Sequence, residues 1–110
     1  MPLFITYGSY SQSGVKGLLE NPSDRSQAIQ GMLDKVGAKL VALYMTTGSN
    51  DFVLVSEAED GSDTVALGMV TAASGSISKM ETVRAWTSAE FVDIAKKAAS
   101  LTGSYTPPGN

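Results

Sequence analysis

The sequence predicts an α+β fold: a ferredoxin-like domain with the order βαββαβ and a further C-terminal helix. Its 110 residues suit one domain with one hydrophobic core. Segments with strand-like alternation are interleaved with segments whose apolar residues recur every three or four positions. Apolar residues make up 43% of the chain, which is too many for a disordered protein. We expect the domain to span residues 1–102 and residues 103–110 to form a flexible tail.

The first strand is expected at residues 3–10, where side chains alternate between two faces. Residues 11–19 predict a short helix or turn with Ser11 as its N-cap. An Asn-Pro-Ser-Asp break then starts a longer helix, for which Ser23 or Asp24 is the expected cap. This longer helix carries an apolar stripe at spacings of three and four, as expected for a helix that packs on a sheet.

The second and third strands are expected at residues 39–47 and 51–57, joined by a short turn into a hairpin. Gly37, just before them, suits a left-handed cap at the end of the preceding helix. The second strand is apolar on both faces. Strict alternation would place Leu40, Ala42 and Tyr44 on one face and Val41, Leu43 and Met45 on the other.

A helix at residues 64–73 and a fourth strand at residues 77–87 follow. The alternation of the fourth strand is expected to turn its smaller apolar residues, Val83 and Ala85, toward the helices. The opposite face would then carry Thr82, Arg84 and Trp86.

A last helix is expected after this strand, with Ser88 as its cap and Glu90 near its positive end. Its apolar residues recur with helical spacing and are expected to face inward. They are Phe91, Ile94, Ala95 and Ala98.

Right-handed crossovers would place the connecting helices on one face of a four-stranded antiparallel sheet. The other face would be uncovered, although the second strand is apolar on both sides. We therefore expect a second copy of the chain to cover it, so that two sheets stack about 10 Å apart as a dimeric α/β barrel. The terminal helix or the tail is the alternative cover.

Composition excludes several kinds of chemistry. The chain has no Cys and no His, which rules out thiolate or imidazole ligands and nucleophilic pairs that need them. The net charge of −3 gives no basic footprint for nucleic acid or an anionic membrane. No apolar run approaches the roughly 20 residues that span a bilayer, and no signal-peptide pattern is present. We expect a cytoplasmic protein without a cofactor.

Several segments, in order along nearly the whole chain, resemble the GYD-domain family. These segments are residues 7–16, 21–25, 37–40, 44–51, 57–60, 80–87 and 90–91. The family is named for a Gly-x-Tyr-Asp signature, whereas this chain reads Gly48-Ser49-Asn50-Asp51. Asn50 thus replaces the signature Tyr. The resemblance implies a dimeric α/β-barrel fold and no defined reaction.

Four residues are candidates for binding a small molecule: Tyr7, Tyr44, Arg84 and Trp86. Arg84 would be a forked donor for an anion and Trp86 an apolar wall. The alternative is that Arg84 forms an ion pair and Trp86 packs in a dimer interface. The tyrosines, in turn, are alternatively core residues with satisfied hydroxyl groups.

The loop residues Gly48, Asn50 and Asp51 are candidates for contacting a ligand. The alternative is a tight turn in which Gly48 and Asn50 adopt unusual backbone angles and Asp51 accepts N–H bonds. The acidic residues that follow the third strand lack the calcium-loop pattern and read as a helix-capping loop, so no metal site is expected.

The leading functional hypothesis is a homodimer, or higher homo-oligomer, that binds a small organic molecule or a protein partner without a defined reaction. One alternative is a small cofactor-free enzyme, an oxygenase or isomerase, that relies on Tyr, Arg and carboxylate groups. A closed pocket lined by Tyr7, Tyr44 and Arg84 would favour it. Another alternative is a structural or assembly subunit.

Overall fold

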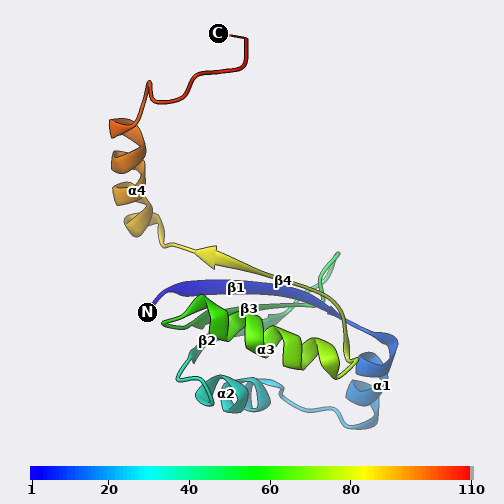
Figure 1. Cartoon of the computed structure of the whole chain (residues 1–110). Helices are drawn as coiled ribbons and strands as arrows, with labels where there is room; N and C mark the ends of the chain where they lie inside the picture. The colour runs from blue at the N-terminus through cyan, green and yellow to red at the C-terminus, as the bar shows by residue number, and fades with distance from the viewer. Residues whose placement is uncertain (110) are drawn as a thin grey trace.

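The computed structural model describes residues 1–109, which form four strands and four helices (Figure 1). In chain order these are β1 (Leu3–Tyr10), α1 (Gln12–Glu20), α2 (Ser26–Asp34), β2 (Lys39–Met45), β3 (Phe52–Glu57), α3 (Gly61–Ala73), β4 (Ile77–Ala85) and α4 (Ser88–Ser100). The order βαββαβα is confirmed, with two helices in the first crossover.

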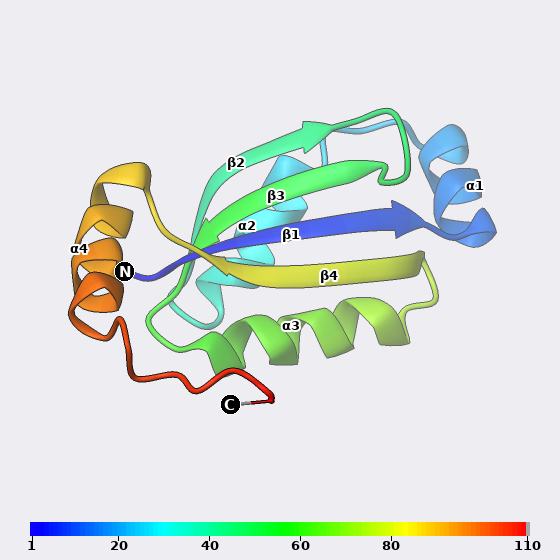
Figure 2. The ribbon, with the colours of Figure 1, turned by 90° about the horizontal axis from the view of Figure 1, so that it is seen from above.

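The four strands form one antiparallel sheet in the order β2-β3-β1-β4. Helices α2 and α3 lie on one side of this sheet (Figure 1). Figure 2 looks onto the other side, which neither helix covers. The predicted ferredoxin-like α+β fold, with helices on one face of a four-stranded antiparallel sheet, is thereby confirmed.

The hydrophobic core lies between the sheet and its two covering helices. Its buried members are Phe4, Leu33, Ala38 and Ala58, with Ile29, Val36, Leu40 and Leu67 packed around them. The helix α2 ends as predicted: the N–H of Ala38 donates to the Leu33 carbonyl at 3.0 Å, and Gly37 has a φ of 69°. This pair of features is a left-handed glycine cap.

The predicted cap of α1 is confirmed at Ser11, whereas the N-cap position of α2 is Arg25 rather than Ser23 or Asp24. The Ser11 hydroxyl accepts from the N–H of Gly14 at 3.2 Å. Helix α1 also touches the α3–β4 loop so closely that a Cβ on Gly14 would lie 2.2 Å from the Ser76 carbonyl oxygen. At the start of α2, an Asp24 carboxylate oxygen accepts from the N–H of Ser26 at 2.9 Å.

A bulge in β2 corrects the predicted alternation of that strand. The pairing with β3 shifts register between Leu40 and Ala42, so the exposed Val41 has no paired residue. Leu40 therefore shares the helix-covered face and packs on the core, while Ala42 and Tyr44 lie on the other face. A single extra residue in one strand reverses the facing of every residue before it.

The faces predicted for β4 are wrong. Thr82 and Arg84 pair with Thr6 and Phe4, whose side chains are buried under the helices, whereas Val83 pairs with Ile5 on the uncovered face. The Thr6 and Thr82 hydroxyl oxygens lie 2.8 Å apart, which fixes this register. The register with β1, and not the size of the side chains, decides which residues of β4 face the helices. Arg84 lies at the end of the sheet, where its long side chain extends over the Phe4 ring.

Helix α4 also departs from the prediction. Its cap is Thr87 rather than Ser88, and its apolar stripe does not face the core of its own chain: Phe91 is 55% exposed. The helix projects from the end of β4 on the uncovered side of the sheet (Figure 1). This projection raises the Cα radius of gyration to 17.8 Å, compared with about 13 Å for a compact domain of this length.

Of the tail predicted at residues 103–110, residues 104–107 form neither helix nor strand. Residue 110 lies outside the described residues. The flexibility of the tail, and the domain boundary at residue 102, stay predictions.

Candidate functional site

The uncovered side of the sheet presents a continuous apolar surface, which we call the open face. It is set by the strand pairing: Ile5 of β1 lies between Val55 of β3 and Val83 of β4. Its apolar members are Leu3, Ile5, Tyr7, Ala42, Tyr44, Val53, Val55, Val83 and Ala85. An uncovered sheet face is expected to be polar. This one is apolar through its centre, which is typical of a surface that another molecule covers.

Charged residues lie at both ends of the open face. Lys39 pairs with Glu57 at one end, and Lys79 and Glu81 of β4 lie at the other. An apolar centre with a charged border matches the anatomy of protein interfaces, where charge is depleted from the core and retained at the rim.

Two of the four predicted site residues lie together on the open face. Tyr7 and Tyr44 both pair with Val53, one from each neighbouring strand, and they are 37% and 64% exposed. Neither is a core residue. The two tyrosines therefore flank the same valine on the open face, and both are exposed there.

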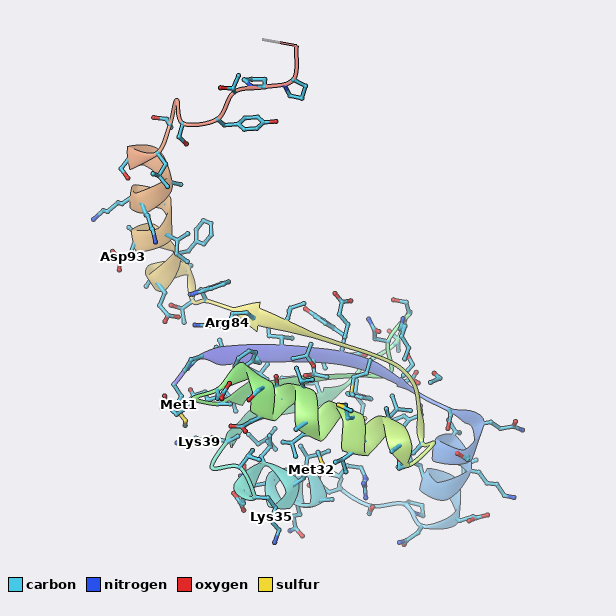
Figure 3. All side chains as sticks on the ribbon, viewed as in Figure 1. Met1, Met32, Lys35, Lys39, Arg84 and Asp93 are labelled. Carbon is cyan, nitrogen blue, oxygen red and sulfur yellow. The ribbon has the colours of Figure 1, made fainter. Side chains whose placement is uncertain are left out.

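Arg84 lies on the other side of the sheet from these tyrosines. Its guanidinium carbon is 5.7 Å from the centre of the Phe4 ring and 4.5 Å from that of Trp86. One of its Nη atoms donates to the Leu3 carbonyl at 3.1 Å and also to the Ala85 carbonyl. Figure 3 shows Arg84 at the junction between the sheet and α4. The pocket that would favour the enzyme hypothesis, lined by Tyr7, Tyr44 and Arg84 together, is therefore not formed.

The loop Gly48–Asp51 is bonded firmly to β1. An Asp51 carboxylate oxygen accepts from the N–H of Tyr10 at 2.9 Å, and the Asp51 N–H donates to the Gly8 carbonyl at 2.7 Å. Gly48 has a φ of 95°, as expected, but Asn50 has an ordinary backbone conformation. These bonds give Asp51 a structural role and leave ligand contact by the loop a hypothesis.

Helix α3 is apolar on its outward side as well as on its inward side, where Leu67 packs on the core. Thr64 and Thr71 face the sheet and donate to carbonyls of their own helix at 2.7 and 2.8 Å. The outward side carries Val65, Met69 and Val70, which are 63%, 69% and 64% exposed. A helix that is apolar all round is normally buried on both sides. We call Val65, Met69 and Val70 the outer α3 surface.

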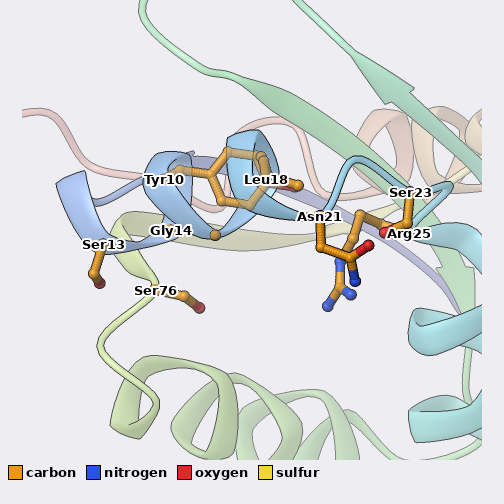
Figure 4. A pocket seen from close by; sticks show the side chains of 9 residues that line it. Tyr10, Ser13, Gly14, Leu18, Asn21, Ser23, Arg25 and Ser76 are labelled. Carbon is orange, nitrogen blue, oxygen red and sulfur yellow. The ribbon is translucent and has the colours of Figure 1, made fainter.

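A pocket of about 280 Å³ lies between α1 and the segment that leads into α2 (Figure 4). The Arg25 guanidinium points into it beside Asn21, and hydroxyl groups of Ser13, Ser23 and Ser76 surround it. Tyr10 forms one wall. Burial raises the pKa of the Tyr10 hydroxyl; the charge of Arg25 opposes this rise and that of Asp51 adds to it.

Sequence reasoning missed this pocket, although a signal was present. Two of the segments that resemble the GYD family, residues 7–16 and 21–25, each supply residues to it. Two segments that resemble the same family can lie side by side in the fold and line one pocket. The arginine predicted to bind an anion was Arg84, which lies on β4.

The carboxyl groups with shifted pKa values lie at the starts of helices α2, α3 and α4. The pKa values of Asp24, Asp60 and Glu90 all lie below their usual range because backbone N–H groups donate to the ionised forms. Within residues 1–109, no group of three or more His, Cys, Asp or Glu residues could hold a metal ion. None of the helices in that span is long and apolar enough to cross a membrane.

The fold and the open face define a ferredoxin-like α+β domain with one uncovered apolar sheet face. Residues 4–95 match the GYD domain, and the chain belongs to the GYD domain family. This confirms the family predicted from the sequence.

Among curated proteins, the chain is similar to the glutamine synthetase and cystathionine beta-lyase binding protein of Thermus thermophilus. The two are 38% identical over 81 residues, which are 73% of this chain and 84% of the relative. Among solved structures, the chain resembles TTHA0845, also from Thermus thermophilus, with a TM-score of 0.50 and 16% identity. That match covers 80% of this chain and 96% of the other, and it supports the fold alone.

Proposed function

We propose that this chain is a non-catalytic, protein-binding domain that works in the cytoplasm as a homodimer or higher homo-oligomer. The open face joins two copies, and the outer α3 surface binds another protein. The proposal needs neither a cofactor nor a metal.

The observation that carries the protein-binding part is the exposed outer α3 surface. Val65, Met69 and Val70 each expose more than half of their side-chain surface, on the side of α3 that faces away from the sheet. Removing such side chains from water contributes about 1.5–3 kcal/mol each. Leu67 packs on the core from the inward side of α3, whereas these three side chains remain exposed, so core packing does not account for them.

The name of the relative from Thermus thermophilus suggests which kind of partner this chain binds. It is named as a binding protein for glutamine synthetase and cystathionine beta-lyase. We propose that this chain also binds metabolic enzymes, with enzymes of these two kinds as the first candidates.

The open face supports the dimer. Two such faces would stack about 10 Å apart and remove each apolar centre from water. Lys and Glu residues lie at both ends of the face, so a two-fold arrangement can set unlike charges opposite one another. Two sheets stacked face to face in this arrangement form the predicted dimeric α/β barrel.

The test is binding of the full-length chain to purified glutamine synthetase and cystathionine β-lyase from the same organism, measured by biolayer interferometry. Met69→Glu places a charge at the centre of the outer α3 surface, and Val55→Asp places one at the centre of the open face. We expect Met69→Glu to weaken enzyme binding at least about tenfold and to leave the dimer intact. We expect Val55→Asp to yield monomers in sedimentation equilibrium.

The matched control is Gln12→Glu, which adds the same charge at an exposed position of α1, remote from both surfaces. It should leave enzyme binding and dimerisation unchanged. Binding that Met69→Glu does not alter would overturn the role of α3. A wild-type chain that sediments as a monomer at micromolar concentration would overturn the dimer.

A second candidate function, binding of a small anion, is favoured by the pocket beside Arg25. A guanidinium with several hydroxyl groups around it suits a carboxylate or phosphate. Titration with inorganic phosphate and with acetate, followed by NMR shifts of the Tyr10 and Ser76 amides, tests this function. Shifts that persist in Arg25→Gln would remove Arg25 as the anion anchor. Arg84 and Trp86, which the sequence predicted to bind a small molecule, instead stack on each other, and Arg84 also lies over the Phe4 ring.

A further inference from the structure

Helix α4 has a hydrophobic side that its own chain does not bury. Among residues 1–109, no other helix or strand packs extensively on it. Phe91, and Leu101 directly after the helix, are each 55% exposed. An isolated helix of 13 residues is only marginally stable in water, because helices in proteins draw most of their stability from packing of an apolar face. An exposed apolar side of this kind is typical of a surface that another molecule covers.

The position of α4 is fixed at its first turn. Thr87 and Glu90 form a reciprocal capping box: the Thr87 N–H donates to the Glu90 carboxylate at 2.8 Å, and the Glu90 N–H donates to the Thr87 hydroxyl at 3.1 Å. Just before it, Trp86 stacks on Arg84, which is bonded to Leu3 of the sheet. The capping box thus defines where α4 begins, and the stack of Trp86 on Arg84 connects the residue before it to the sheet. Because α4 projects from the sheet, we call it the arm.

The apolar side of the arm is turned toward the space above the open face. Figure 3 shows Asp93 on the side of α4 that points away from that space. At 100° per residue, Phe91 and Ala98 lie about 160° and 140° from Asp93 around the helix. The apolar stripe and the open face therefore border the same region.

The arm is long enough to contact a second copy of the sheet stacked on the open face. Thirteen residues at 1.5 Å each give a helix of about 20 Å. A second sheet stacked on the open face would lie about 10 Å above the first. The arm is long enough to pass the edge of that sheet and to reach the helices behind it.

We propose that α4 is an exchanged dimerisation arm, whose apolar stripe packs on the second copy of this chain. The inference rests on the homodimer proposed above. A two-fold axis generates two equivalent arms, so each copy both gives and receives one. One pairing operation then covers the open face and the stripe of Phe91, Ile94, Ala95 and Ala98 together. This also explains why that stripe is apolar although it faces away from its own core.

The decisive measurement uses a dimer mixed from isotope-labelled and unlabelled full-length chains. A half-filtered NMR experiment on this sample detects only contacts between chains. We expect cross-peaks between the Phe91 ring or Leu101 methyl groups and methyl groups of the other copy. Contacts of these side chains with their own copy alone would overturn the exchange.

Point variants supply a second, independent measurement. Phe91→Asp should raise the dimer dissociation constant at least about tenfold, since it charges the stripe while an acidic residue in the first turns favours the helix itself. Lys97→Gln changes the net charge by the same amount on the polar side of α4 and should have no effect. Helicity measured by circular dichroism verifies that the monomer fold persists in both.

The outcomes separate the two proposals. If Val55→Asp breaks the dimer and Phe91→Asp does not change its dissociation constant, the arm proposal fails and the open-face dimer stands. If the wild-type chain is monomeric at micromolar concentration, both fail.

Discussion

The guanidinium carbon of Arg84 lies 4.5 Å from the centre of the Trp86 ring. On its other side the same group lies 5.7 Å from the Phe4 ring, and it donates to the Leu3 carbonyl at 3.1 Å. Arg84 thus connects the first strand to the segment that starts α4. Two residues that sequence analysis proposed as a ligand site instead join the sheet to its terminal helix.

Replacing Arg84 by Gln should lower the free energy of unfolding by about 2 kcal/mol. Each stack with an aromatic ring contributes about 0.5–1 kcal/mol, and the hydrogen bond to Leu3 contributes about 1 kcal/mol. Urea denaturation provides the measurement. Trp86 is the only tryptophan in the chain, so its fluorescence also reports the junction directly.

Lys79→Gln is the matched control for Arg84. It removes the same charge from the same strand, where Lys79 makes one exposed hydrogen bond to the Ser49 carbonyl. We expect a loss below about 0.5 kcal/mol. Equal effects of the two substitutions would show that net charge, and not the stack, is responsible.

Gly8→Ala should destabilise the domain strongly. A Cβ at Gly8 would lie 2.3 Å from the Phe52 ring, which is buried against the strand. Such overpacking costs about 1–3 kcal/mol. Gly31 is the control, because nothing lies within 4 Å of a Cβ added there and its φ is ordinary. Gly31→Ala within α2 should instead stabilise by about 0.5–1 kcal/mol, and thermal unfolding distinguishes the two signs.

The fold could be predicted from the sequence because its signals are local and agree with one another. Each strand and helix lies within a few residues of its expected place, and the caps at Ser11 and Gly37 were recognisable from residue type. The faces of β2 and β4 were not predictable in the same way. A bulge at Val41 and the pairing of Arg84 with Phe4 depend on the register between strands, which alternation within one strand does not contain.

The candidate site was predicted less well than the fold. The uncovered apolar face was foreseen from the two apolar sides of the second strand, although the bulge moves Leu40 to the core. Arg25 lies in a loop without periodicity, so no spacing pattern marks it. The sequence signal for the pocket is that residues 7–16 and 21–25, which both line it, resemble the same family. The projection of α4 could not be predicted from the sequence either, because an apolar stripe has the same pattern whether it covers its own core or another surface.

Thr82→Val should cost more stability than Thr6→Val. The two hydroxyl groups are 2.8 Å apart, and Thr6 is only 8% exposed whereas Thr82 is exposed. Removing the Thr82 hydroxyl leaves that of Thr6 buried without its partner, which costs about 1–3 kcal/mol. Removing the Thr6 hydroxyl leaves one that water can reach.

The double variant Thr6→Val, Thr82→Val completes this cycle. Because it removes both polar groups, it should be more stable than Thr82→Val alone. Urea denaturation of the four proteins measures the coupling. Strictly additive losses would contradict a direct bond between the two hydroxyl groups.

Acid should loosen the helix starts before it affects the core. The pKa values of Asp24 and Asp60 lie below the usual 3.8 and that of Glu90 below 4.5, because backbone N–H groups donate to the carboxylates. A lowered folded-state pKa means that the unfolded chain binds protons first. The stabilisation is therefore complete at pH values above about 5 and is lost as the pH falls through the folded-state values.

Glu90→Gln isolates the contribution of α4 to this acid response. A glutamine at this position retains an oxygen that can accept from the Thr87 N–H, but it does not titrate. Amide exchange of α4 in the wild-type chain should accelerate between about pH 5 and pH 3 relative to its intrinsic rate, and that pH dependence should largely vanish in Glu90→Gln. An undiminished pH dependence in the variant would assign the acid response of α4 to a group other than its capping carboxylate.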